Sequence, residues 1–348
     1  MRYGTRVSRT DVHRIERHVT EALATVIGRF TLHRFDLVEG PAAFAVTRGD
    51  LRGDGPLLAR VHSSCITAEV FGGCDCDCRE QLAAALERIS AAGRGIVFYL
   101  QQEGRGAGFG AKVRDRMLVQ ASGNRLTTFD AYDQLGIPHD QRTYETVAAM
   151  RARLGVRAPL QLLTGNATKA EAVRRDGSPV AGHTPLRVPV SAYSAHHLRA
   201  KRGAGEAVEQ HAGAVALPPE RVMVTEPTVL DEAPDVTHVG GYWLPIRAPH
   251  PAWFRLDAYV DERTSATLVM LRHGRSAGTP TRILWDRVRD RFPVQDRATR
   301  PAIRPTMRPS WGAAASRIVR DGGGRALFLP EGRPFDDAAA AILAHEID

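Results

Sequence analysis

All four cysteines of this 348-residue chain lie close together, at Cys65, Cys74, Cys76 and Cys78. Clustered thiolates are the ligands that a soft divalent ion such as Zn²⁺ prefers. The N-terminal residues lack the apolar core of a secretory signal, so we do not expect a disulfide framework. Two kinds of zinc site fit the pattern. One is a closed structural site with four thiolates; the other uses three thiolates and leaves one position open for a catalytic water.

The residues after the cysteines predict a helix. Asp77 can cap a helix in which Leu82, Leu86 and Ile89 recur at helical spacing, and Gly93 can end it. Such a helix would hold the end of the cysteine cluster in place.

A strand and a glycine-rich segment follow. The apolar run from Gly95 to Leu100 predicts a buried strand. It leads into a segment from Gln101 to Lys112 that is rich in glycine and carries Arg105. Small residues allow backbone N–H groups to approach an anion, so this segment is a candidate phosphate-binding loop. The alternative is a surface turn without a ligand.

Five segments carry a resemblance to a known family. They are RVHSSC (60–65), CDC (76–78), GRGIVFYLQQEGRGAGF (93–109), DQLGIPHDQRTY (133–144) and LGVRAPLQLLTGNATK (154–169). In this order and spacing they resemble GTP cyclohydrolase II, which opens the imidazole ring of GTP at the start of riboflavin synthesis. The resemblance covers roughly residues 28–190. It implies an α/β fold with a mixed sheet and helices.

The resemblance also implies a mechanism. One Zn²⁺ per chain would be held by Cys65, Cys76 and Cys78, whereas Cys74 would be a small buried residue. A water activated by zinc would attack C8 of the purine, and two hydrolyses would release formate. The family separately releases pyrophosphate from the triphosphate. Mg²⁺ would accompany the substrate phosphates.

The resemblance assigns further site residues. Asp140 and Arg142 match the pair that acts at the triphosphate, although they could simply form a loop ion pair worth less than ~1 kcal/mol. Thr164 could simply end a strand. The residues matching nucleotide contacts are Arg60, His62, Ser63, Ser64, Gln81, Glu103, Gly104, Arg105, Thr128, Thr164 and Lys169.

Several positions depart from the family pattern. Arg116 aligns with a catalytic tyrosine, and arginine cannot act as a general acid near neutral pH. Ser64 replaces a glutamate, Gln101 replaces a basic residue, and Gly165 and Ala167 change the family's TNNP turn. These changes predict either a paralogue with a modified substrate or product, or a housekeeping enzyme that has drifted.

The second half of the chain resembles the first. FTLHRF from Phe30 matches FRLDAY from Phe254, and residues 83–105 resemble residues 313–333. Arg289 stands at the position of Cys65, so the second copy would be catalytically dead. We predict a catalytic domain at 1–198, a linker at 199–238 and a smaller, degenerate α/β copy at 239–348. The two copies would form an intramolecular pseudo-dimer, and a homodimer of whole chains stays open.

Composition points to an enzyme with a polyanionic substrate. The net charge is +8, and 43% of residues are hydrophobic. No run of residues is apolar enough for a membrane span, and the scattered arginines argue against a nucleic-acid partner. We therefore expect a cytoplasmic enzyme acting on GTP or a related nucleotide, in riboflavin or secondary metabolism. The alternatives are a paralogue that uses another nucleotide or stops at the formylated product, and a non-catalytic regulator that binds nucleotide or nucleic acid.

Overall fold

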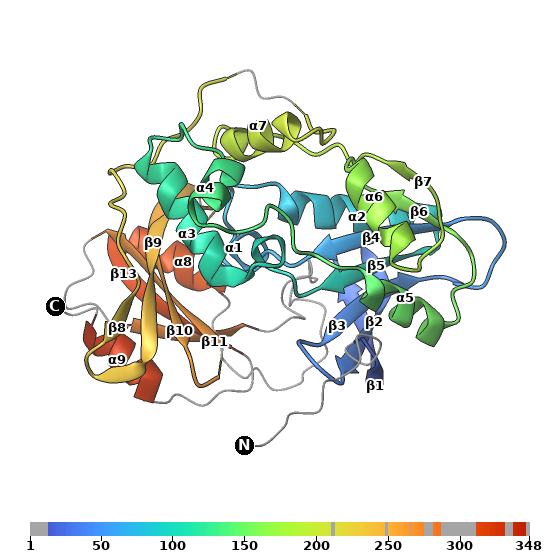
Figure 1. Cartoon of the computed structure of the whole chain (residues 1–348), viewed down its shortest axis with the longest axis horizontal. Helices are drawn as coiled ribbons and strands as arrows, with labels where there is room; N and C mark the ends of the chain where they lie inside the picture. Colours follow the sequence, from blue (N-terminus) through green and yellow to red (C-terminus); the bar gives the residue numbers. More distant parts are fainter. Residues whose placement is uncertain are drawn as a thin grey trace.

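The computed structural model describes residues 13–209, 213–247, 250–264, 266–274, 281–286, 311–330 and 337–345. They form two mixed β-sheets with helices packed on them, one sheet in each half of the chain (Figure 1). This confirms the predicted α/β class. Within these ranges, every helix is too short or too polar to cross a lipid bilayer.

The first sheet has seven strands in the order β1-β2-β3-β5-β4-β6-β7. Strands β1, β2, β3 and β5 are antiparallel neighbours, whereas β5, β4, β6 and β7 run parallel. Parallel strands place their carboxyl ends at one edge of the sheet, where ligands bind in α/β proteins. The strands are β1 (Ile15–Thr25), β2 (Gly28–Leu37), β3 (Ala43–Arg48), β4 (Leu57–Ser63), β5 (Gly95–Leu100), β6 (Leu160–Leu163) and β7 (Val180–Thr184).

Helices cover both faces of this sheet. Along β5, Ile96 and Phe98 face the side that α5 and α6 cover, whereas Val97 and Tyr99 face α2. This alternation explains why the whole strand is apolar. The helical segments of the first half are α1 (Ile66–Glu69), α2 (Cys78–Ala92), η1 (Gly104–Gly106), α3 (Gly108–Ala121), α4 (Thr128–Gln134), α5 (Glu145–Leu154), α6 (Ala167–Arg175) and α7 (Ala195–Gly203).

The predictions for α2 and β5 are confirmed. Two details are corrected: the cap of α2 and the length of the glycine-rich segment after β5. Asp77 is the N-cap residue of α2 and Gly93 ends it in a left-handed conformation, but the Asp77 side chain makes no capping hydrogen bond. The glycine-rich segment is shorter than expected. Helix α3 begins at Gly108, so Lys112 lies inside a helix and not in a loop.

The second sheet has six strands in the order β12-β13-β11-β10-β9-β8. Helix α8 covers one face, and α9 covers the other. The elements are β8 (Thr228–Leu230), β9 (Ala233–Arg247), β10 (Pro251–Asp261), β11 (Ala266–Gly274), β12 (Thr281–Asp286), α8 (Trp311–Arg320), β13 (Gly323–Pro330) and α9 (Asp337–His345).

The two sheets share an arrangement of strands. In the first, β1-β2-β3-β5 are antiparallel and β5 is parallel to β4; in the second, β9-β10-β11-β13 are antiparallel and β13 is parallel to β12. A glycine with positive φ follows β3 and ends β11, at Gly49 and Gly274. A Cβ on either would collide with a carbonyl oxygen, that of Gly93 or that of Gly322. This is the arrangement that a repeated module predicts.

The observed elements can be compared with the expected domain boundaries, but some expected residues of the second copy lie outside the described ranges. Helix α7 runs across the boundary drawn at residue 198, and β9 begins at Ala233, before the expected start of the second domain. Arg289 and residues 331–333 of the second copy lie outside the described residues.

Candidate active site

A cavity lies at the carboxyl ends of three neighbouring parallel strands, β5, β4 and β6. Ser64 and Cys65 follow β4, residues 102–105 follow β5, and residues 164–166 follow β6, and all of them line the cavity. The parallel part of the sheet therefore brings together three segments that are far apart in the sequence.

Three of the four cysteines form a compact group. The Sγ atoms of Cys65, Cys76 and Cys78 all lie within 4.8 Å of one another, and those of Cys65 and Cys76 are 3.6 Å apart. Thiolates around one tetrahedral Zn²⁺ lie about 3.8 Å apart, given Zn–S bonds of about 2.3 Å. Cys74 lies outside this group and points its Sγ at the carbonyl oxygen of Pro245, 3.4 Å away. The donor set therefore fits a zinc ion with three protein ligands.

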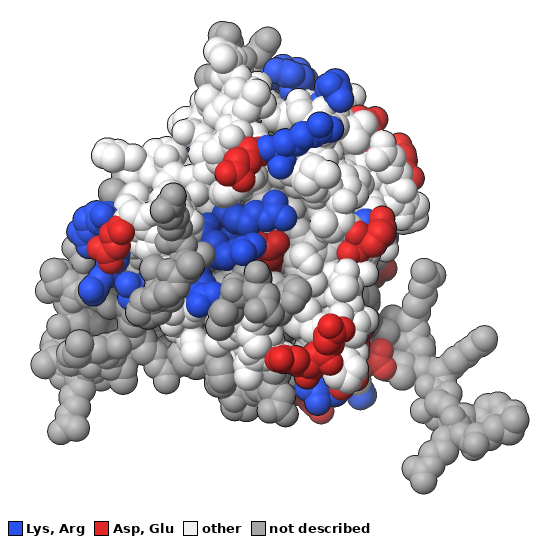
Figure 2. All heavy atoms as spheres, turned by 90° about the vertical axis from the view of Figure 1, so that its left-hand side faces the viewer, with Lys and Arg blue, Asp and Glu red and all other residues white. Residues whose placement is uncertain are grey.

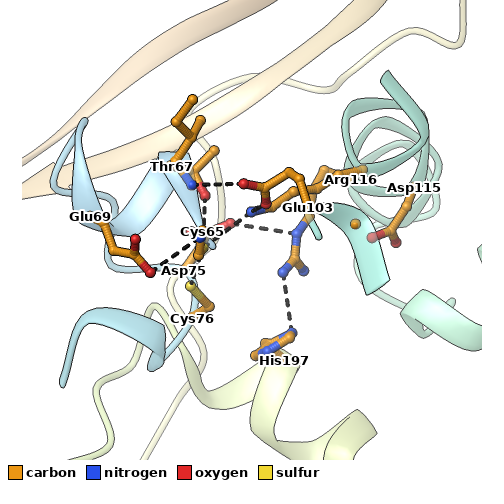
Figure 3. A network of polar contacts seen from close by, with 12 residues as sticks. Cys65, Thr67, Glu69, Asp75, Cys76, Glu103, Asp115, Arg116 and His197 are labelled. Atoms are coloured by element: carbon orange, nitrogen blue, oxygen red, sulfur yellow. Dashed lines mark hydrogen bonds and ion pairs between the residues drawn. The ribbon is translucent and has the colours of Figure 1, made fainter. Parts of the chain in front are cut away.

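Polar side chains surround Cys65 (Figure 3). Lys112 donates from Nζ to the Cys65 Sγ at 3.2 Å and to Glu103 at 2.6 Å. The pKa of Cys65 is lowered well below its usual value, first by the neighbouring thiols of Cys76 and Cys78 and further by the charge of Lys112. The Lys112 ammonium thus favours the charged form of Cys65.

Glu69 anchors the backbone of the same segment. Its carboxylate accepts hydrogen bonds from Cys65 N at 3.1 Å, from His62 Nε2 at 2.8 Å and from the Tyr99 hydroxyl at 2.5 Å. Burial lowers the pKa of His62. Its Nδ1 is buried without a partner among the described residues, although the ring borders the cavity. His62 therefore offers an acceptor to a ligand.

Helix α7 fixes the second cysteine segment. Lys201 donates from Nζ to Asp77 Oδ1 at 2.6 Å, and Gln81 donates from Nε2 to the other oxygen at 2.5 Å. Asp77 stands between Cys76 and Cys78, so this buried network holds both ligands. It also explains why the Asp77 carboxylate does not cap α2.

A set of cations also lines the cavity. Arg60 donates to Leu163 O at 2.6 Å and to Gln81 Oε1 at 2.5 Å, and Lys169 donates to Val61 O at 2.6 Å. Burial lowers the pKa of Lys169 well below its usual value, and the charges of Arg142 and Arg60 lower it further. An anionic ligand would relieve this repulsion, as the phosphates of a nucleotide do.

Arg142 and Asp140 form a two-point ion pair beside these cations. Arg142 donates to Asp140 from Nε at 2.8 Å and from Nη2 at 2.5 Å. Burial opposes ionisation of Asp140, but these hydrogen bonds outweigh it and lower its pKa. The pair orients the guanidinium towards the cavity, which Arg142 lines and Asp140 does not.

The turn at Gly104–Gly106 places Arg105. All three residues have positive φ, which is unusual for an arginine. A Cβ on Gly106 would lie 2.9 Å from the carbonyl carbon of Gln141, so glycine allows the two segments to meet there. Gln141 N donates to Arg105 O at 2.9 Å. The turn and the Arg142 segment are thereby joined.

Arg116 lies on α3 and lines the cavity, with contacts to Asp75 and His197 (Figure 3). Its Nε is 3.6 Å from Asp75 Oδ2, and its Nη2 donates to His197 Nδ1 at 3.2 Å. A guanidinium can only donate, so His197 accepts and is neutral; burial lowers its pKa well below the usual value. Although burial alone would lower the pKa of Arg116, Asp75 and Asp115 raise it. Arg116 is a permanent cation here.

Every site residue predicted from the sequence lines the cavity except Asp140, which instead forms hydrogen bonds with the cavity-lining Arg142. The cavity also contains residues that the sequence did not indicate. These are chiefly Asp115, Tyr132, Asn166, His197, Lys201 and Glu206. Three of the six come from α7 and the residues after it. Lys201 and Glu206 lie in the stretch predicted mainly as a linker, at 199–238, and His197 lies just before it.

Comparisons with known proteins identify the family of the first half. A sequence model of the GTP cyclohydrolase II family matches residues 16–185. The GTP cyclohydrolase-2 of Streptomyces coelicolor is 43% identical over 196 residues, which is 56% of this chain and 85% of that protein. That of Shewanella amazonensis is 39% identical over 183 residues, 52% of this chain and 87% of that protein. The matched part is about half of the chain.

Proposed function

This chain belongs to the GTP cyclohydrolase II family, and from that premise we propose that its first half opens the imidazole ring of GTP by hydrolysis. One observation carries the proposal: three clustered thiols line a strongly cationic cavity at the ends of three parallel strands. A nucleoside triphosphate has both a ring to be attacked and phosphates to be bound. The family consists of hydrolases, and the named relatives act on GTP.

Cys65, Cys76 and Cys78 are the residues that would hold zinc. When bound, zinc would activate a water for attack on C8. Lys112 donates a hydrogen bond to the Cys65 Sγ, and Lys201 binds the carboxylate of Asp77, which stands between the other two ligands. Glu103 accepts from Ile66 N at 2.8 Å and binds Lys112, so it fixes the first cysteine segment.

Arg60, Arg105, Arg142 and Lys169 would bind the phosphates. Mg²⁺ would bind to the same phosphates, because it retains water ligands and prefers phosphate oxygens to a site made of protein ligands alone. Asp140 holds Arg142 in one orientation, which a residue acting at a single phosphorus atom needs. We assign pyrophosphate release to this pair.

Arg116 favours a second candidate, in which the enzyme stops at a formylated product. One water breaks the C8–N9 bond and leaves a formyl group on N7; a second water must break the C8–N7 bond to free formate. The second cleavage needs a proton for the departing amine. A guanidinium flanked by Asp75 and Asp115 donates hydrogen bonds but supplies no proton at neutral pH.

One experiment tests both candidates. The full chain, loaded with zinc, is incubated with GTP and Mg²⁺, and the products are identified by mass while formate and pyrophosphate are measured. Ring-opened product is expected from the wild type and not from Cys76→Ser. Formate equal to the product would reject the second candidate, and an unchanged nucleotide would reject the proposed function.

The regulator alternative has less support. Retention of all three cysteines and of the Asp140–Arg142 pair argues for catalysis. Figure 2 shows the side of the molecule on which the second half lies. On its described atoms, Lys and Arg form separate groups with acidic side chains between them, not the continuous basic stripe that nucleic acid requires.

We also propose that the second half is a degenerate copy that forms a pseudo-dimer with the first. The shared strand order and the paired glycines support this, and the second half has no cysteine. A common apolar core, which includes Phe71 and Val113 from the first half and Phe254 and Trp311 from the second, joins the two. A homodimer of whole chains is compatible with this arrangement.

A further inference from the structure

The outer edge of β9 is closed by the first half of the chain. On one side β9 pairs with β10, but on the other side β8 reaches only as far as His238. Beyond it, alternate residues turn their main-chain groups away from β10, as an antiparallel ladder requires. Trp243 N donates to Gln120 Oε1 at 2.8 Å, and Trp243 O accepts from Gln120 Nε2 at 2.7 Å.

The next two alternate residues, Pro245 and Arg247, form hydrogen bonds with residues 72–74. These residues belong to the loop before Cys76, which we call the cysteine loop. Pro245 O accepts from Cys74 N at 2.9 Å, and Arg247 N donates to Gly72 O at 3.0 Å. Gly73 and Ile246 form an isolated antiparallel bridge. Residues 72–74 therefore continue the second sheet as a short added strand, immediately before Cys76.

Gly73 joins this contact to the other cysteine segment. Its N–H donates to Thr67 O at 2.8 Å. A Cβ here would lie 2.8 Å from both Thr67 O and Leu244 Cδ1. The loop before Cys76 is thus packed between β9 and the turn after Cys65, so β9 fixes the distance between two ligand segments.

We propose that β9 makes the second half a working part of the active site, because its main chain positions the cysteine loop. This inference rests on the proposed function. The second half thereby has a role at the metal site although it carries no catalytic motif.

The role of the β9 main chain is tested by the rate of zinc release, which does not depend on turnover of substrate. Arg247→Pro removes the N–H that binds Gly72, and Arg247→Ala keeps it; both lose the ion pair with Glu80. Zinc transfer from each full-length variant to a coloured chelator is timed, after circular dichroism has verified folding. Arg247→Pro is expected to release zinc at least tenfold faster than Arg247→Ala. Equal rates would overturn the role of β9.

Absence of turnover in the wild type would overturn the proposed function, while the chelator comparison still decides on β9.

Discussion

Asp115 gives the folded protein a measurable dependence on pH. It is buried beside Arg116, and burial raises its pKa from 3.8 to about 6 despite the opposing charge of Arg116. A rise of about 2 units corresponds to about 3 kcal/mol of unfolding free energy. Because the folded pKa is the higher one, this stability is fully present below pH 3.8 and is lost as the pH rises through 6.

Asp115→Asn should remove that dependence. Between pH 5 and pH 8 the unfolding free energy of the variant should rise relative to wild type by about 1.5 kcal/mol, which is half of the full effect. Urea unfolding of both zinc-loaded proteins at several pH values measures the difference, in which the titration of other groups cancels.

A second buried aspartate serves as the control. Burial would raise the pKa of Asp257, but hydrogen bonding to His238 and the charges of Arg255 and Arg272 lower it to about 2. It is ionised in both states from pH 5 to pH 8. With its hydrogen-bond partner His238 replaced by Gln in both compared proteins, Asp257→Asn should therefore destabilise the protein by an amount that does not vary with pH. A flat difference for Asp115→Asn as well would refute the reasoning.

The remaining predictions concern the metal, the triphosphate and the second half. Cys76→Ser should lose zinc and activity, whereas Cys74→Ser should keep the metal, as measured by elemental analysis; zinc loss from Cys74→Ser would indicate four thiolate ligands. Arg142→Ala should abolish pyrophosphate release with zinc retained, and Arg142→Lys should not restore it, because an ammonium cannot form the two-point pair with Asp140. Deleting residues 240–348 should expose the shared apolar core, so the fragment should aggregate in light scattering, and a stable monomer would contradict the shared core.

Local signals in the sequence predicted part of the fold well. The apolar spacing of α2, its terminal Gly93 and the apolar run of β5 are each encoded within a few residues, and the structure has these elements at those positions. The start of α3 was missed, because glycines at 104–110 suggest a loop whether or not a helix follows them.

Residues that reach the cavity from distant segments could not be predicted in this way. Lys201 and Glu206 lie in a polar stretch without a motif, and their place depends on contacts across more than a hundred residues. The contact of β9 with residues 72–74 has no motif either, because only the packing of one half on the other brings these two segments together.

The hydrogen bonds between β9 and residues 72–74 also set an order of events during synthesis. Arg247 leaves the ribosome 171 residues after Cys76. At ~5–20 residues per second, that interval is roughly ten to thirty seconds. Throughout it, the cysteine loop lacks the strand that holds it, and its thiols are open to oxidants and to other metals. On the proposed function, stable zinc loading would therefore be a late step, and a chain that stalls before residue 247 would carry reactive thiols without their support.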